Sequence, residues 1–236
     1  MSQLLQNIGK IGLLLIFMLS TYAMLSIAFP YLSPPFPTDI DFLANKPKWL
    51  VQLDHYMLAF YIHISCSILV LAAGLSQFSK RLMFRYPIWH RNIGKLYVFV
   101  VLFLSAPSGL VMAFYGSGGA AAQWAFVLQA SGWWFFTYMA YRKIRQGKLR
   151  EHGAFMLRSY AMTFSAISLR AGTYVVSYFK ISMGIRCPNE DWSLLCYPNF
   201  YVLEAWMSWM GNLFVVEVLL LLGILNYYFP GSVKKA

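Results

Sequence analysis

The chain has 236 residues, of which 59% are hydrophobic and only 11% are charged, and its formal net charge at pH 7 is +11. A soluble domain of this length carries roughly twice that charged fraction, so the sequence lacks the polar side chains that a water-exposed surface needs. The basic residues gather in two short loops between apolar segments, which argues against a nucleic-acid-binding surface. The composition therefore indicates an all-α protein whose partner is the lipid bilayer.

Six apolar segments follow one another along the chain, and each approaches the roughly 20 residues that a helix needs to cross the hydrocarbon core. The first ends at Pro30, and because no small-residue cleavage site follows it, we expect a membrane anchor rather than a cleaved signal peptide. The sequence thus predicts a polytopic transmembrane helical bundle that forms one integral membrane domain over residues 1–236. The expected spans are residues 11–29, 54–78, 93–115, 122–141, 153–178 and 200–229.

Lysine and arginine are distributed unevenly between the two sides of this predicted bundle. One side has the basic loops 80–95 and 142–150, together with Lys10, Lys234 and Lys235. The other side has only Lys46, Lys48, Lys180 and Arg186. Because cytoplasmic loops are enriched in Lys and Arg, we predict that both termini lie in the cytoplasm and that loop 180–199 lies on the non-cytoplasmic side.

The chain has three cysteines. Cys66 lies inside an apolar segment, which is typical of a buried small hydrophobic residue. Cys187 and Cys196 close a short polar loop on the predicted outer side, where an oxidising compartment favours a disulfide. A pair of metal-binding thiolates is the alternative, but no histidine or further cysteine lies near these two in the sequence. We therefore predict a disulfide between Cys187 and Cys196.

Four charged residues lie within the last two predicted spans: Arg158, Arg170, Glu204 and Glu217. An unpaired arginine at the centre of a transmembrane helix costs several kcal/mol on insertion scales, so we expect these side chains to find partners. At a rise of about 1.5 Å per residue, Arg158 matches Glu217 in depth and Arg170 matches Glu204. We predict these two ion pairs, with Asp54 as a rival partner for Arg170. Such pairs either fix the helix register or leave one arginine to hold an anionic substrate, a lipid phosphate or a cofactor propionate.

His90 and His152 open the third and fifth predicted spans at the cytoplasmic surface. A haem with two histidine ligands needs imidazoles at similar depth on facing helices, each oriented by a hydrogen bond to its second nitrogen. His90 and His152 meet the depth condition, and Arg158 lies near enough in the sequence to serve a propionate. They are therefore the candidate ligands of a haem b.

His63 lies about two helical turns inside the second span and has no histidine at its own depth. Met162, near the middle of the fifth span, is a conceivable second ligand. The simpler interpretation of all four histidines is that they hydrogen-bond neighbouring helices or face solvent at the membrane surface. No zinc motif, phosphate-binding loop or serine nucleophile is present, so the sequence identifies no metal site and no catalytic residue.

Several short motifs occur in order over roughly residues 60–172. They are His63 with Gly74, Gln77 and Phe78; His90-Arg91-x-x-Gly94-Lys95-x-Tyr97; Ser105-Ala106-Pro107-Ser108-Gly109; His152-x-x-x-Met156-x-Arg158-Ser159-Tyr160-Ala161-x-Thr163; and Leu169-Arg170. Together they resemble a family of bacterial predicted membrane proteins known as domain of unknown function 2306. The chain departs from the family pattern at Gly153, where a basic residue is usual, and at Phe155, where tryptophan is typical.

The resemblance implies a multi-pass protein of the bacterial cytoplasmic (inner) membrane, but it implies no settled reaction. Our first hypothesis is a membrane redox protein that binds haem or quinone. The second is a transporter or small-ligand binder, in which Pro107 breaks the third helix and Arg158, Glu217 and His63 line a polar path. The third is an assembly or scaffold subunit that contacts a membrane partner or a second copy of the chain.

Overall fold

A computed structural model describes residues 2–187 and 196–229, and all regular structure within these ranges is helical. Lys234, Lys235 and residues 188–195 of loop 180–199 lie outside the described residues. The α-helices are α1 (Ser2–Leu32), α2 (Asp41–Ala44), α3 (Lys48–Val51), α4 (Asp54–Ser76), α5 (Lys80–Arg85), α6 (Pro87–Val100), α7 (Ala106–Ala113), α8 (Gly119–Arg145), α9 (Leu149–Ser182), α10 (Asn199–Leu221) and α11 (Ile224–Tyr228). A π-helical turn, η1 (Val101–Ser105), joins α6 to α7.

Three helical stretches are long and apolar enough to cross a membrane, namely Asp54–Ser76, Pro87–Ala113 and Asn199–Leu221. In α1 the apolar stretch Met18–Leu32 is shorter. The helices α8 and α9, with 27 and 34 residues, exceed the required length but carry more polar side chains. The structure therefore shows a helical protein with three stretches that are long and apolar enough to span a membrane among the described residues, and a six-span topology stays a prediction.

Several helix ends differ from the predicted ones, and the differences lie at prolines and at one glycine. Pro87 takes the first position of α6, where its missing N–H is harmless, so this helix begins before the predicted 93. Helix α1 passes through Pro30, the predicted stop, and ends at Leu32. The predicted last span ends early, because Gly223 adopts a φ of 79° and turns the chain into α11.

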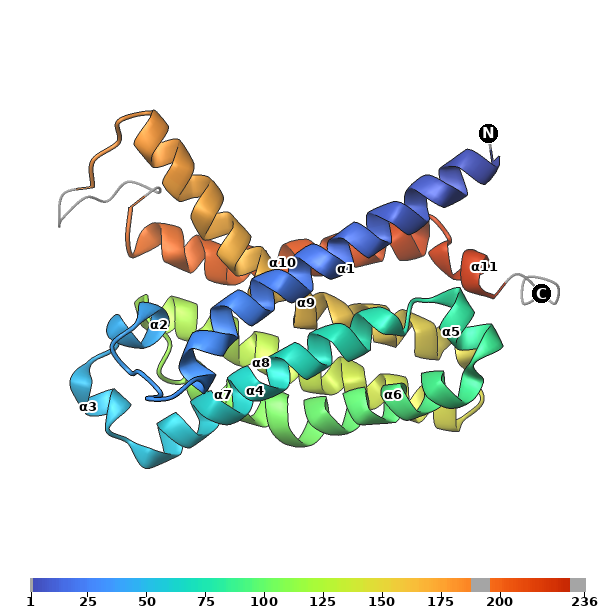
Figure 1. Ribbon diagram of the computed structural model, residues 1–236, viewed down its shortest axis with the longest axis horizontal. Helices are drawn as coiled ribbons and strands as arrows, with labels where there is room; N and C mark the ends of the chain where they lie inside the picture. Colours follow the sequence, from blue (N-terminus) through green and yellow to red (C-terminus); the bar gives the residue numbers. More distant parts are fainter. Residues whose placement is uncertain (1, 188–195, 230–236) are drawn as a thin grey trace.

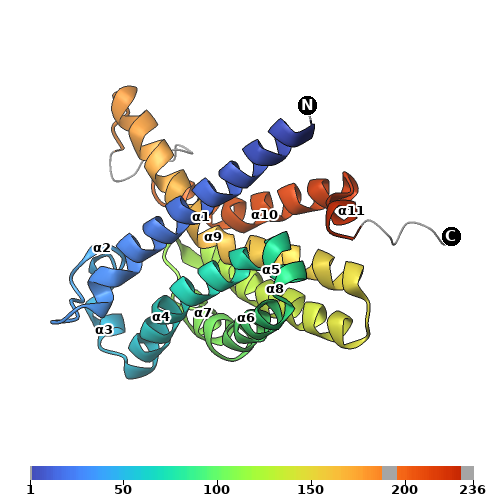
Figure 2. The same ribbon diagram turned by 45° about the vertical axis from the view of Figure 1, so that its right-hand side comes forward.

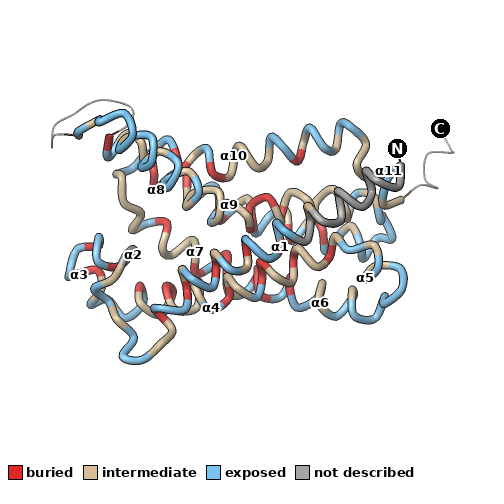
Figure 3. The backbone as a smooth tube through the Cα atoms, turned by 45° about the horizontal axis from the view of Figure 1, so that its top comes forward, coloured by how far each residue is buried: buried red, intermediate tan, exposed pale blue. Residues whose placement is uncertain are grey.

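The long helices pack into a bundle in which α8, α9 and α10 lie side by side and α1 crosses over α4 (Figures 1 and 2). The N-terminal half of α1 and the C-terminal half of α9 extend away from this bundle in different directions (Figure 1). The start of α1 lies at the same end as α5 and α11, opposite α2 and α3 (Figure 1). One cluster of buried residues lies between α4, α6, α8 and α9, and a smaller cluster joins the end of α1 to α4. The far half of α9 is mostly exposed (Figure 3).

A buried network of hydroxyl groups joins α6, α8 and α9. The Tyr97 hydroxyl lies 2.8 Å from both Ser159 Oγ and Thr163 Oγ1, and Thr137 Oγ1 lies 2.6 Å from Ser159 Oγ. Tyr97, Thr137 and Ser159 are completely buried. The network satisfies these polar side chains between helices, as a membrane-spanning bundle requires.

Candidate functional site

A cavity of about 780 Å³ lies between α1, α4, α7, α8, α9 and α10. Most of its lining is apolar, and Phe60, Trp133 and Met162 are among the residues that form it. Lys46, His63 and Arg170 also line it, whereas none of the described lining residues is Asp or Glu. A largely apolar cavity with a few polar groups is the usual form of a small-molecule site.

His63 is held in this cavity by the backbone of the π-turn. Its Nδ1 atom lies 3.0 Å from the carbonyl oxygen of Ser105, the last residue of η1. A carbonyl oxygen can only accept a hydrogen bond, so Nδ1 carries the proton, and Nε2 of the neutral ring is an acceptor. The predicted break of the helix at Pro107 is wrong. The chain forms a π-turn before the proline and stays helical to Ala113.

The space for the imidazole comes from Gly109. A Cβ atom at this position would lie 2.9 Å from His63 Cε1, which is closer than side-chain atoms approach one another. The Trp133 ring faces the imidazole edge-on, with 6.5 Å between ring centroids. Within the described part of the chain His63 Nε2 has no hydrogen-bond partner, and it is not sealed off by protein atoms, so it faces the cavity. Met162, the predicted second ligand, lines the same cavity.

Lys46 lies at the other end of the cavity, in the turn between α2 and α3. It is only 9% exposed, and its Nζ donates hydrogen bonds of 2.9 Å to the Tyr115 carbonyl oxygen and to Ser117 Oγ. Lys46 also borders a second pocket of about 410 Å³, rimmed by Trp49, Tyr115 and Tyr197. Burial lowers the pKa of Lys46 from its usual 10.5 to about 8. In the sequence Lys46 indicates only the side of the membrane, and its burial at the cavity was not predicted.

His90 and His152 lie close enough for their charges to interact, although they are on different helices. His152 Nδ1 lies 2.9 Å from the Ala140 carbonyl oxygen, which leaves Nε2 as the unprotonated nitrogen of the neutral ring. His90 Nδ1 is buried and has no hydrogen-bond partner among the described residues. Neither histidine lines the cavity that contains His63.

The structure contains an ion pair between Arg158 and Glu217. Arg158 Nε donates to Glu217 Oε1 at 2.6 Å and Nη2 donates to Oε2 at 2.8 Å, so the contact is bidentate. The guanidinium also lies 5.5 Å from the centroid of the Phe155 ring. Both carboxylate oxygens of Glu217 accept hydrogen bonds from Arg158, so the pair connects α9 to α10 with good geometry.

Arg170 and Glu204 do not form the second predicted pair in the described residues. Glu204 accepts a hydrogen bond of 2.9 Å from Thr173 Oγ1, and its other oxygen, Oε1, is buried without a hydrogen-bond partner. The reason is steric, because Gly172 leaves room for this carboxylate against α9, where a Cβ would lie only 2.6 Å from Oε1. Arg170 lines the cavity instead.

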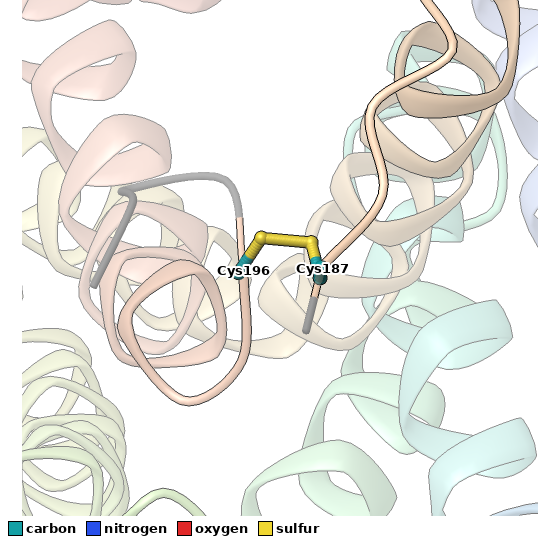
Figure 4. The surroundings of a disulfide bond; sticks show 2 residues. All are labelled: Cys187 and Cys196. Carbon is teal, nitrogen blue, oxygen red and sulfur yellow. A yellow bond between two sulfur atoms is a disulfide. The ribbon is translucent and has the colours of Figure 1, made fainter. Parts of the chain in front are cut away.

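Cys187 and Cys196 form a disulfide with a Cα–Cα distance of 5.7 Å, within the ordinary range (Figure 4). The bond joins the segment after α9 to the start of α10, and the loop that it closes, 188–195, lies outside the described residues. In the described ranges no group of three His, Cys, Asp or Glu side chains is placed to hold a metal ion.

The family model described as "Predicted membrane protein (DUF2306)" matches residues 60–220. No curated protein and no solved structure matches the chain. The matched segment includes His63, the π-turn and Arg170, whereas α1 and Lys46 lie before it.

Proposed function

We propose that this chain, which belongs to the family of predicted membrane proteins described as DUF2306, binds an amphipathic small molecule in the cavity between α1, α4, α8 and α9. The apolar body of that molecule packs against Phe60, Trp133 and Met162. A hydroxyl or N–H group of the molecule donates a hydrogen bond to His63. This corresponds to the small-ligand binder of our second hypothesis, and a quinol is the redox-active member of the same ligand class.

The orientation of His63 is the single observation that carries this proposal. Its Nδ1–H is committed to the Ser105 carbonyl, so Nε2 presents a lone pair to an otherwise largely apolar cavity. A polar atom in such surroundings gains most from a ligand that supplies the missing hydrogen bond, and a ligand without a donor leaves it unsatisfied. The site should therefore discriminate between a hydroxyl and a carbonyl at the same place on a ligand.

Decylubiquinol and decylubiquinone test this discrimination, because they share an alkyl tail and differ in whether the ring oxygens carry hydrogen. Titration of the detergent-purified protein, followed by tryptophan fluorescence, should show at least about tenfold tighter binding of the quinol, the effect of one hydrogen bond to an otherwise unsatisfied group. The variant His63→Leu should bind both equally, and His55→Leu, outside the cavity, should behave as the parent. Binding of neither probe, or an unchanged preference in His63→Leu, would contradict the proposal.

A haem b between His90 and His152 is the second candidate function. The hydrogen bond that orients His152 supports it. His90 and His152 would hold the haem iron, and the haem would supply one-electron redox chemistry. Absorption spectra of the protein before and after dithionite reduction test this candidate. A Soret band that is lost in His90→Ala and His152→Ala supports it, and a colourless protein from haem-rich cells contradicts it.

We also propose six membrane spans in the bacterial cytoplasmic membrane, with both termini inside. The position of the start of α1, α5 and α11 at one end of the bundle, and of the disulfide at the end of α9, supports this orientation (Figure 1). Exposed apolar side chains on α1 and on the far half of α9, such as Phe29 and Tyr178, offer contacts to lipid, to a second copy or to a partner subunit.

A further inference from the structure

The Lys46 ammonium lies in an unusual electrostatic position. It is almost completely buried, yet none of the ion pairs formed by described residues includes it. Two of its three N–H groups bond neutral oxygens, and the Phe42 ring lies 4.8 Å from Nζ. Neutral partners compensate a buried charge only in part, so an ammonium in this position favours an anion beside it.

Lys46 also stands where two cavities meet. It borders both the smaller pocket rimmed by Trp49, Tyr115 and Tyr197 and the large cavity that contains His63. Tryptophan and tyrosine prefer the headgroup level of a bilayer, so the smaller pocket is placed where a lipid-like molecule keeps its polar end. No Asp or Glu is among the described residues that line either cavity.

The two ends of the cavity are connected by α7 and the turn that follows it. Gly109, on α7, leaves the space for His63, and the carbonyl of Tyr115, in the turn after α7, accepts the hydrogen bond from Lys46. From Gly109 to the end of α7 at Ala113 the helix rises by roughly 6 Å, at about 1.5 Å per residue, and Tyr115 lies two residues further along the chain. One amphipathic molecule can therefore reach from Lys46 to His63.

We infer that Lys46 binds the acidic head, a phosphate or a carboxylate, of an amphiphile whose apolar body enters the large cavity. This inference rests on the proposed function and adds the charge class of the ligand. The ammonium supplies a point charge and one remaining N–H, and Ser117 Oγ lies within hydrogen-bonding range of the same Nζ. Neutral amphiphiles of equal length lack the group that Lys46 selects.

Dodecyl phosphate is the probe, and its binding is measured by calorimetric titration of the protein in a neutral maltoside detergent. Dodecanol and inorganic phosphate, which represent the two halves of this molecule, are titrated for comparison. The parent protein should bind dodecyl phosphate at least about tenfold more tightly than either half. Lys46→Gln keeps a hydrogen-bond donor for Tyr115 and removes the charge, so it should lose that preference over dodecanol. Lys46→Arg should keep it. Lys48→Gln is the matched control, because Lys48 is exposed and lines neither cavity.

Three results would overturn the inference: unchanged binding in Lys46→Gln, an equal loss in Lys48→Gln, or inorganic phosphate binding as tightly as the amphiphile. If Lys46→Gln does not fold, the decline of dodecyl phosphate binding at high pH still decides the question, because Lys46→Arg should abolish that decline. If dodecyl phosphate does not bind but decylubiquinol still binds in a His63-dependent way, only the inference of an acidic head group is contradicted. If neither dodecyl phosphate nor decylubiquinol binds, the proposed function itself is contradicted.

Discussion

The Nδ1 atom of His63 donates a hydrogen bond to the carbonyl oxygen of Ser105 across 3.0 Å, from α4 to the end of the π-turn. This bond sets the tautomer of the imidazole and therefore the chemical character of the atom that faces the cavity. Ser108 Oγ donates its shorter hydrogen bond, of 2.6 Å, to the Leu104 carbonyl and lies 3.1 Å from the Ser105 carbonyl oxygen as well. Changes near this bond should alter ligand binding without touching the ligand.

Gly109→Ala is expected to displace the imidazole, because the new Cβ would lie 2.9 Å from His63 Cε1. Overpacking of this kind costs about 1–3 kcal/mol, and a shifted Nε2 should weaken decylubiquinol binding by about tenfold or more. Thermal unfolding and the fluorescence titration measure the two effects. Gly211→Ala is the control, since a Cβ there meets no atom within 4 Å. Equal binding by the two variants would show that Gly109 does not position His63.

Tyr97→Phe should lower stability by about 1–3 kcal/mol, because it removes the hydroxyl that bonds both Ser159 and Thr163 in a completely buried place. Chemical denaturation of the detergent-solubilised protein, followed by circular dichroism, measures this loss. Tyr138→Phe should change stability far less, because Tyr138 is exposed. Similar values for both variants would mean that the hydroxyl network contributes little to the bundle.

Glu217→Gln should destabilise the bundle by leaving Arg158 without its carboxylate inside a predicted span. The Arg158 side chain is 23% exposed and that of Glu217 is 47% exposed, so we expect a moderate effect of about 1–2 kcal/mol. The double variant Arg158→Gln/Glu217→Gln should recover part of that loss, because it removes both charges. A double-mutant cycle by thermal unfolding gives the coupling, and strictly additive effects would argue against an energetic role for the pair.

The affinity for dodecyl phosphate should fall as the pH rises above about 8, the pKa that burial gives Lys46. The anion binds the ammonium form, so above this pKa binding must take up a proton, and the affinity decreases about tenfold per pH unit. Below pH 8 Lys46 stays charged, so its contribution to the affinity should depend little on pH. The other titratable groups among the described residues that line the two cavities are Tyr31, His63, Tyr115, Arg170, Tyr197 and Tyr201. Calorimetry from pH 7 to 10 tests this, and Lys46→Arg should abolish the decline, because a guanidinium stays charged.

Alkaline phosphatase, a reporter that is active only outside the cytoplasm, tests the orientation. A fusion after Arg186 should be active, and a fusion after Gly147, in the turn between α8 and α9, should be inactive. Green fluorescent protein fused at the same positions should give the reverse pattern. Activity at both positions would require a different number of spans.

The helical class, the disulfide and the Arg158–Glu217 contact could be predicted because each depends on composition or on distance along a helix. Depth along an axis was enough to match Arg158 with Glu217. It failed for Arg170 and Glu204, because Gly172 and Thr173 decide which side of α9 the carboxylate meets. The direction in which a helix face points is a property of packing that residue spacing does not give.

The contacts of His63 and Lys46 could not be predicted from the sequence for a related reason. Both side chains bond backbone carbonyls of residues far away in the chain, Ser105 and Tyr115. Every residue has a carbonyl, so no residue type marks it as a partner. The significance of Lys46 depends further on its burial between two cavities, which exists only once α1 and α4 have packed.

The π-turn Val101–Ser105 makes the cavity sensitive to chain length rather than to residue identity. A π-turn accommodates one more residue than an α-helical turn, and each residue rotates a helix by about 100°. Deleting one residue from this stretch would restore a regular helix and turn α7 relative to α6 by that angle, which carries Gly109 and Ser105 away from His63. A single-codon deletion outside the cavity lining could thus remove the site while every side chain that contacts the ligand remained in the sequence.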